Sequence, residues 1–229
     1  MPDLATLAAS ADRFLGAVRA LTDDDVRGAC ALPGLTRAHL LTHVAQAAGS
    51  RSGMLRAAQA GLIGEQYPSE QARADAIEAG ARRPAAIIRA DLDRAVSECL
   101  TAMRQHPAGR WDAPAIWLRG GRHPVRGTVA SLRSELEYHH VDLAAGYAPD
   151  DWPTEFVATE LRRVTTLMDR RADAPSMTLI GAASVRIGTV PPVDVTGSPA
   201  AVLAWLSGRG AGSGLDTGGA GLPSLPPLA

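Results

Sequence analysis

The segment Arg133-Ser-Glu-Leu-Glu-Tyr-His-His-Val-Asp142 lies within residues 128–145, which we predict to form a helix. Glu135 and His139 are four residues apart, so both side chains project from one face, and Asp142 continues that stripe one turn later. A carboxylate and an imidazole at this spacing can supply two ligands to one divalent ion. A single pair of this kind is more often a surface hydrogen bond, so a metal site needs a partner elsewhere in the chain.

A second predicted helix offers such a partner. It is expected to begin after an N-cap at Thr36 and carries His39 and His43, again four residues apart. Either histidine, facing the Glu–His pair, would complete a three-ligand site with a position left open for water or a thiolate. His43 lies among Leu40 and Val44, which favours an inward position, whereas His39 lies toward the helix start. The spacing alone leaves both open.

The rest of the N-terminal part is also expected to be helical. Apolar residues recur at three- and four-residue intervals over residues 4–21. Ser69 can cap a third helix, and Pro84 either starts or interrupts a helical segment that continues to Leu100. Residues 107–126 hold three prolines and three glycines and are predicted to be a long irregular connection. Four principal helices with unequal loops predict a bundle whose core can hold a metal.

The sequence pattern changes near residue 150. After the turn-rich joint Pro149-Asp-Asp-Trp-Pro153, helices are predicted over 155–171 and 200–206, and strands over 177–187 and 193–195. The last residues are rich in Gly, Pro and Ser. We therefore predict an α+β chain with three parts: a mainly α, metal-binding four-helix bundle (1–149), a small α+β domain (150–210) and a flexible tail (211–229).

Composition excludes several classes of function. All 23 of the lysine-plus-arginine residues are arginine, which excludes mechanisms that use a Schiff-base or phosphate-loop lysine. The net charge of −1 disfavours broad binding to nucleic acid. No apolar stretch approaches the roughly 20 residues that a membrane span needs. The acidic first segment lacks the basic start of a secretion signal, so we expect a cytoplasmic protein that binds neither nucleic acid nor membrane.

The chain is also poor in cysteine. Cys30 and Cys99 are too few and too far apart for a disulfide framework or a cysteine-rich metal site. Both are expected to be structural, since Cys99 falls in an apolar helical pattern and Cys30 lies near a helix end. A thiolate required by the chemistry would therefore come from outside the chain.

Four segments resemble motifs of the mycothiol-dependent maleylpyruvate isomerases, which belong to a broader group of DinB-like metal-binding bundles. Leu32-Pro-Gly-Leu-Thr-Arg-Ala-His-Leu-Leu-Thr-His-Val-Ala45 is similar to the opening metal motif, and Arg133–Leu143 to the second. The others are Arg73-Ala-Asp-Ala-Ile-Glu-Ala-Gly80 and Ala204-Trp-Leu-Ser-Gly-Arg209. One departure is Leu35, where the family often has a tryptophan.

The resemblance implies specific roles. Zinc would be held by His43, Glu135 and His139, and Arg73 and Arg209 would be catalytic, binding the two carboxylates of the substrate. The cofactors would be zinc and mycothiol, a low-molecular-weight thiol. The implied reaction is addition of the thiolate to maleylpyruvate, bond rotation and elimination to fumarylpyruvate. Without the resemblance, Arg73 would be read as a solvated helix arginine, and Arg209 as a complement to a helix dipole.

Other functions suit the same scaffold. A mycothiol-dependent thiol S-transferase acting in detoxification would share the metal and the thiol but differ in its substrate pocket. A non-catalytic regulatory module would bind metal without thiol-dependent turnover. The presence of both Arg73 and Arg209 favours a small dicarboxylate substrate, and therefore the isomerase. Asp142 is expected to orient a ligand histidine through a hydrogen bond.

Overall fold

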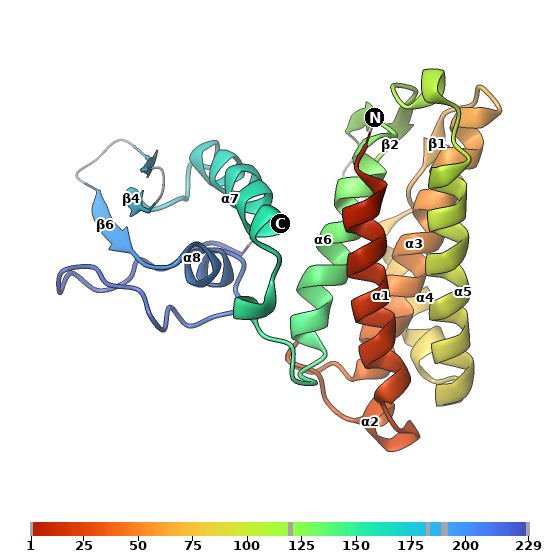
Figure 1. The fold of residues 1–229 in the computed structure, drawn as a ribbon, viewed down its shortest axis with the longest axis horizontal. Coiled ribbons are helices and arrows are strands. Elements are labelled where there is room, and N and C mark those ends of the chain that lie inside the picture. Colours follow the sequence, from red (N-terminus) through yellow and green to blue (C-terminus); the bar gives the residue numbers. More distant parts are fainter. Residues whose placement is uncertain (1, 119–120, 182–183, 189–191, 228–229) are drawn as a thin grey trace. The chain divides into compact units, whose positions relative to one another are not determined.

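The structure is a computed structural model that describes residues 2–118, 121–181, 184–188 and 192–227 (Figure 1). It divides into two compact units, Met1–Gly146 and Tyr147–Ala229, and each is described by itself. The predicted fold class is confirmed: the chain is mostly helical, with small sheets and an α+β C-terminal part. No helix among the described residues has the length and apolar character needed to cross a membrane.

The first unit is built on four long helices that run side by side (Figure 1). They are α1 (Leu4–Ala20), α3 (Arg37–Gln59), α5 (Ala85–Arg104) and α6 (Gly127–Asp142). Helix α3 packs against α5 and α6, and α1 packs against α6 and α5, around a core of buried aliphatic side chains. The predicted bundle is therefore present. A shorter helix, α4 (Glu70–Ala81), packs on α3.

Local sequence explains where these helices begin. The Asp3 carboxylate accepts hydrogen bonds from the first backbone N–H groups of α1, and the Ser69 hydroxyl accepts one at the start of α4. Pro84 occupies the N-cap position of α5, so it starts a new helix rather than interrupting one. Between α1 and α3, a reciprocal capping box between Thr22 and Asp25 forms the five-residue helix α2 (Asp23–Arg27), which was not predicted.

The connection predicted as irregular contains short regular elements. A 3-10 turn, η1 (Ala108–Arg110), precedes the antiparallel strands β2 (Pro114–Ile116) and β3 (Arg122–Pro124), and β1 (Gly64–Glu65) pairs parallel with β2. A side chain on Gly64 would lie 2.9 Å from the Met54 Cα atom, so only glycine lets β1 lie this close to α3. This sheet holds residues 61–68 beside the bundle.

The second unit contains η2 (Pro149–Asp151), α7 (Thr154–Asp169), β4 (Met177–Ile180), β5 (Val185–Ile187), β6 (Val193–Thr196) and α8 (Pro199–Leu206). Its sheet has the order β5-β4-β6, with β4 antiparallel to β5 and parallel to β6. Residues 177–187 thus form two strands instead of the single predicted strand, because the chain bends at Gly181 and pairs back on itself. Helices α7 and α8 pack on each other.

The C-terminal segment pairs with this sheet at Asp216. Asp216 and Thr196 exchange two hydrogen bonds, each with an N···O distance of 2.8 Å. No helix or strand is assigned in the described part of the segment that follows α8. The flexibility of residues 211–229 stays a prediction.

Candidate metal centre

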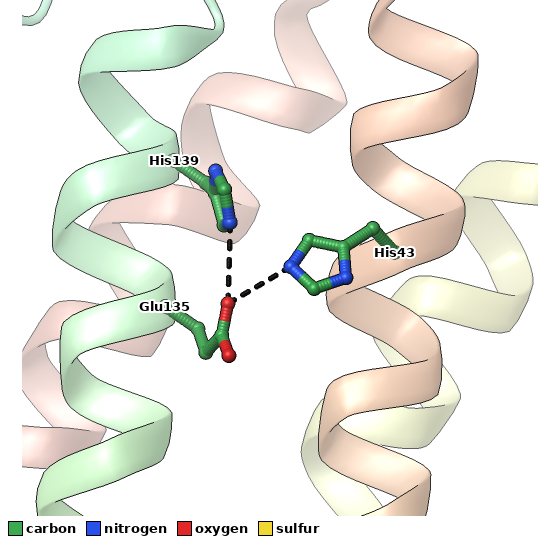
Figure 2. Close-up of side chains that lie close together, drawn as sticks. All are labelled: His43, Glu135 and His139. Atoms are coloured by element: carbon green, nitrogen blue, oxygen red, sulfur yellow. Dashed lines mark hydrogen bonds and ion pairs between the residues drawn. The ribbon is translucent and has the colours of Figure 1, made fainter. Parts of the chain in front are cut away.

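The side chains of His43, on α3, and of Glu135 and His139, on α6, point toward one another between the two helices (Figure 2). The Oε2 atom of Glu135 lies 2.9 Å from His43 Nε2 and 3.2 Å from His139 Nε2. The imidazole rings meet edge to face, with centroids 4.8 Å apart. One potential ligand atom from each residue lies within 4.8 Å of the other two. The i, i+4 spacing and a facing helix thus create a three-donor cluster.

The structure brings His43, and not His39, to this cluster. His39 instead closes the start of α3, where its Nδ1 atom lies 2.7 Å from the Thr36 hydroxyl oxygen and 3.3 Å from the Thr36 backbone nitrogen. Its Nε2 atom lies 3.4 Å from a carboxylate oxygen of Glu78. Thr36 is the N-cap residue that the sequence predicts, but the side chain that completes the cap is a histidine.

Glu137 and His140 lie off this stripe, as the helical spacing predicts. The Glu137 carboxylate accepts a hydrogen bond from the hydroxyl of Ser10 on α1 and pairs with Arg13 at 2.6 Å. The His140 ring meets Phe14 edge to face, at a centroid distance of 5.8 Å. These contacts connect α6 to α1 and so determine which side of α6 faces α3.

A buried arginine holds the second oxygen of Glu135. The Nη2 atom of Arg51 donates to Glu135 Oε1 at 3.0 Å and to the Ser131 hydroxyl at 2.6 Å, while its Nη1 atom donates to the Ala47 carbonyl at 2.7 Å. Burial raises the pKa of Glu135, but hydrogen bonds from His139 and His43 and the charge of Arg51 outweigh it and hold that pKa well below its ordinary value.

Arg51 was missed by the sequence reasoning. It lies eight residues after His43, about two helical turns, and therefore on the same face of α3. The four-residue interval that joins His39 to His43 leads on through Ala47 to Arg51, so helical spacing would have placed it on this face. Only its burial distinguishes it from the other arginines of the chain, because its side chain is 1% exposed.

The Nδ1 atoms of the two histidines have opposite kinds of hydrogen-bonding partner: an acceptor at His139 and a donor at His43. His139 donates from Nδ1 to the buried Asp142 carboxylate at 2.8 Å, which leaves its Nε2 atom facing Glu135. Burial lowers the pKa of His139, but hydrogen bonds and attraction from Asp142 and Glu135 outweigh it and raise that pKa above its usual value. When neutral, His139 therefore keeps its proton on Nδ1 and an Nε2 lone pair for a metal.

Neutral His43 carries its proton on the other ring nitrogen, Nε2. Arg73 can only donate, so its Nη2 atom, 2.9 Å from His43 Nδ1, requires a lone pair on that nitrogen. The proton of neutral His43 then lies on Nε2, directed at Glu135. Burial lowers the pKa of His43, which favours this neutral form. Ligation of a metal through Nε2 would move the proton to Nδ1 and break the bond from Arg73.

A cavity of about 420 Å³ adjoins the cluster. His43, Glu135 and Arg73 line it together with Gln66, Tyr67, Glu70, Ala74 and Leu118. The guanidinium of Arg73 lies over the Tyr67 ring, 5.8 Å from its centroid. Gln66 is fixed by a hydrogen bond that its Oε1 atom accepts from the Leu118 backbone N–H at 2.9 Å. Gln66 and Tyr67 directly follow β1, which pairs with β2, and Glu70 is the first residue of α4. None of the three was predicted to line the site.

Arg209 belongs to the second unit, directly after α8. Its backbone N–H donates to the Ala204 carbonyl at 2.8 Å, and its Nη1 atom donates to the Ser207 carbonyl at 3.1 Å. Trp205 is buried within that helix and is therefore a packing residue. A catalytic role for Arg209 stays a prediction.

Comparison with known proteins identifies the family. A family model described as "Mycothiol maleylpyruvate isomerase N-terminal domain" matches residues 7–144, more than half of the chain. The chain belongs to this family. The residues matched to the mycothiol maleylpyruvate isomerase N-terminal domain include the whole three-donor cluster, Arg51 and Arg73, whereas Arg209 lies beyond them.

Solved structures support the same fold for this family member. A crystal structure of the mycothiol-dependent maleylpyruvate isomerase matches with a TM-score of 0.92 and 23% sequence identity, over 98% of this chain and 95% of that chain. A histidine-to-alanine mutant of the same enzyme matches with a TM-score of 0.91 and 22% identity, over the same shares. At these identities the likeness establishes the fold. No curated protein matches the chain.

The Asp142–His139 hydrogen bond provides a first testable prediction for this member of the mycothiol maleylpyruvate isomerase N-terminal domain family. If the cluster binds a divalent metal, Asp142→Asn should weaken that binding by about 10- to 100-fold, because the neutral amide no longer enhances the basicity of His139. Competition with a chelating dye measures the affinity. The exposed Glu98→Gln variant serves as the control and should bind the metal like the wild type. Equal affinities in all three proteins would contradict an orienting role for Asp142.

Proposed function

We propose that the chain catalyses the zinc- and mycothiol-dependent cis–trans isomerisation of maleylpyruvate to fumarylpyruvate. The observation that carries the proposal is the convergence of His43, Glu135 and His139. His43 and Glu135 also line a cavity together with Arg73. Membership of the family and the likeness to a crystal structure of the mycothiol-dependent maleylpyruvate isomerase support it.

The donor set of the cluster fits zinc. Two imidazole nitrogens and one carboxylate oxygen are the protein ligands of a common class of catalytic zinc sites, which keep a fourth position open. Here His43, Glu135 and His139 would hold the ion, and Asp142 would orient His139. Bound at this site, zinc would lower the pKa of a thiol ligand, so that the thiolate is available at neutral pH.

The cysteines of the chain are poorly suited to supply that thiolate. Cys99 is buried, and burial raises the pKa of its thiol, which keeps it protonated. The Cys30 sulfur lies 3.5 Å from the Leu35 carbonyl oxygen, at the loop before α3. Neither cysteine lines the cavity next to the cluster. An external low-molecular-weight thiol, mycothiol, is therefore the proposed nucleophile.

In the proposed reaction, the thiolate adds to the double bond of maleylpyruvate, the resulting single bond rotates, and expulsion of the thiolate gives fumarylpyruvate. Arg73 is proposed to bind one carboxylate of this dicarboxylate, because a guanidinium has five donors and only one is directed at His43. Arg209 is proposed to bind the other, and this role rests on the C-terminal motif alone. Both charges would also stabilise the enolate formed on addition.

A spectroscopic assay of maleylpyruvate with and without mycothiol tests the proposal. We expect turnover with the thiol and, on omitting it, a loss of at least about 100-fold, since no cysteine of the chain reaches the cavity to replace it. Removal of the metal with a chelator and its restoration should abolish and recover the same activity. Turnover that is independent of the thiol would refute the mechanism.

One observation favours the S-transferase alternative. Glu70 also lines the cavity, and its negative charge opposes the binding of a dicarboxylate near Arg73. An S-transferase would join the thiol to an uncharged electrophile instead. The two functions separate in one experiment, in which the protein and mycothiol are offered maleylpyruvate or 1-chloro-2,4-dinitrobenzene. Conjugation of the second compound without isomerisation of the first would favour the transferase.

A further inference from the structure

The guanidinium of Arg51 is the most buried charge beside the candidate metal centre. Its side chain is 1% exposed, and it is fixed at both terminal nitrogens: Nη1 by the Ala47 carbonyl, and Nη2 by Ser131 and Glu135. Burying a guanidinium is costly unless it is paired and hydrogen-bonded, so this position is strongly determined by its partners. The fold thus holds a permanent positive charge directly behind Glu135.

Arg51 divides the two oxygens of Glu135 between different partners. It binds Oε1 at 3.0 Å, and Oε2 alone faces the two histidines, at 2.9 Å and 3.2 Å. A carboxylate whose second oxygen is held by a fixed donor offers one ligand atom rather than two. Because Ser131 and Ala47 fix the guanidinium independently of Glu135, the carboxylate cannot rotate without breaking its bond to Arg51.

Arg51 also changes the charge of the centre. The negative charge of Glu135 is offset by the Arg51 guanidinium that pairs with it. With both histidines neutral, as metal ligands are, the three donors and Arg51 together carry no net charge. The two positive charges of a divalent ion would remain uncompensated by these residues, which favours anionic ligands from outside the chain.

From these contacts we propose that Arg51 is a positioning residue that restricts Glu135 to one ligand oxygen and offsets its charge, so that the metal keeps a strong preference for an anionic fourth ligand, the thiolate. The proposal rests on the proposed function, since it assigns Arg51 a part in binding the thiol. It predicts that Arg51 acts on thiol binding more than on metal binding.

Cobalt substitution tests this without turnover. Co²⁺ reports its coordination number through its visible bands and reports a bound thiolate through a near-ultraviolet charge-transfer band. The wild type, Arg51→Met and Arg51→Lys are each loaded with Co²⁺ and titrated with mycothiol at one pH. We expect Arg51→Met to bind one cobalt as the wild type does, but to bind mycothiol about 10- to 100-fold more weakly. Its visible bands should also weaken, which indicates a higher coordination number.

The other variants make the test decisive. Arg51→Lys keeps the charge and should recover part of the thiol affinity, which a purely structural role would not predict. If Arg51→Met does not fold, Ser131→Ala removes one support of the guanidinium and should still weaken thiol binding several-fold. The proposal would be overturned if Arg51→Met had the thiol affinity and the visible bands of the wild type. If Arg51→Met does not fold, the same result in Ser131→Ala would overturn it.

The outcome for the wild type separates this inference from the proposed function. A wild type that binds cobalt but gives no charge-transfer band with mycothiol contradicts the proposed function, and the inference with it. If the wild type and Arg51→Met both give the band at the same thiol concentration, only the inference about Arg51 is contradicted.

Discussion

Replacement of His139 or of His43 by alanine is expected to remove zinc from the protein and to abolish its activity. Each residue would supply one of the three proposed protein ligands. The free energy of zinc binding at a four-ligand site corresponds to about 3 kcal/mol per ligand, so the affinity should fall by roughly 100-fold or more. Metal analysis after dialysis should find about one zinc per chain in the wild type and far less in either variant.

His39→Ala is the matched control, because it removes a histidine one turn earlier on the same helix. It should keep its zinc, since His39 bonds to Thr36 at the start of α3 rather than facing Glu135. It should lose about 1 kcal/mol of stability through the weakened cap, measured by chemical unfolding. Zinc content that is unchanged in His139→Ala and His43→Ala, or lost in His39→Ala, would contradict the assigned ligands.

The long helices are predictable because apolar residues repeat over several turns. In α1, for example, Leu7, Phe14 and Val18 are all buried on one face. The elements that were missed are short. Helix α2 has a single turn, formed by the Thr22–Asp25 capping box, and β1 to β3 have two or three residues each. Neither a helical nor an alternating period can be recognised over so few residues.

Some residues of the candidate site could be predicted from local spacing, whereas others depend on how the helices pack. Glu135 and His139 share a face because of their spacing, which the sequence states directly. The preference for His43 over His39 depends on how α3 is turned toward α6, and on Thr36 engaging His39. Arg51 carries no local mark of its burial, because the partners that fix it include side chains of α6.

Replacement of Arg73 by alanine is expected to separate catalysis from metal binding. A charged hydrogen bond to a substrate carboxylate is worth about 2–5 kcal/mol when one partner is truncated, so kcat/KM for maleylpyruvate should fall by roughly 30- to 5000-fold. Zinc affinity should stay the same or rise. The reason is that Arg73 holds His43 with its proton on Nε2, the nitrogen that faces Glu135, and ligation must undo this arrangement.

Steady-state kinetics and a chelator competition, measured on the same preparations, check both halves of this prediction. Arg82→Ala is the control from the end of the same helix, because the Arg82 side chain is exposed and forms a 3.8 Å ion pair with Glu78. This substitution should change neither kcat/KM nor the zinc affinity. The kcat/KM of Arg73→Lys should lie between the values of the wild type and of Arg73→Ala, because an ammonium keeps the charge but cannot bind a carboxylate in a bidentate manner. A loss of zinc in Arg73→Ala would mean that the arginine supports His43 rather than the substrate, whereas unchanged kcat/KM would remove it from the catalytic site altogether.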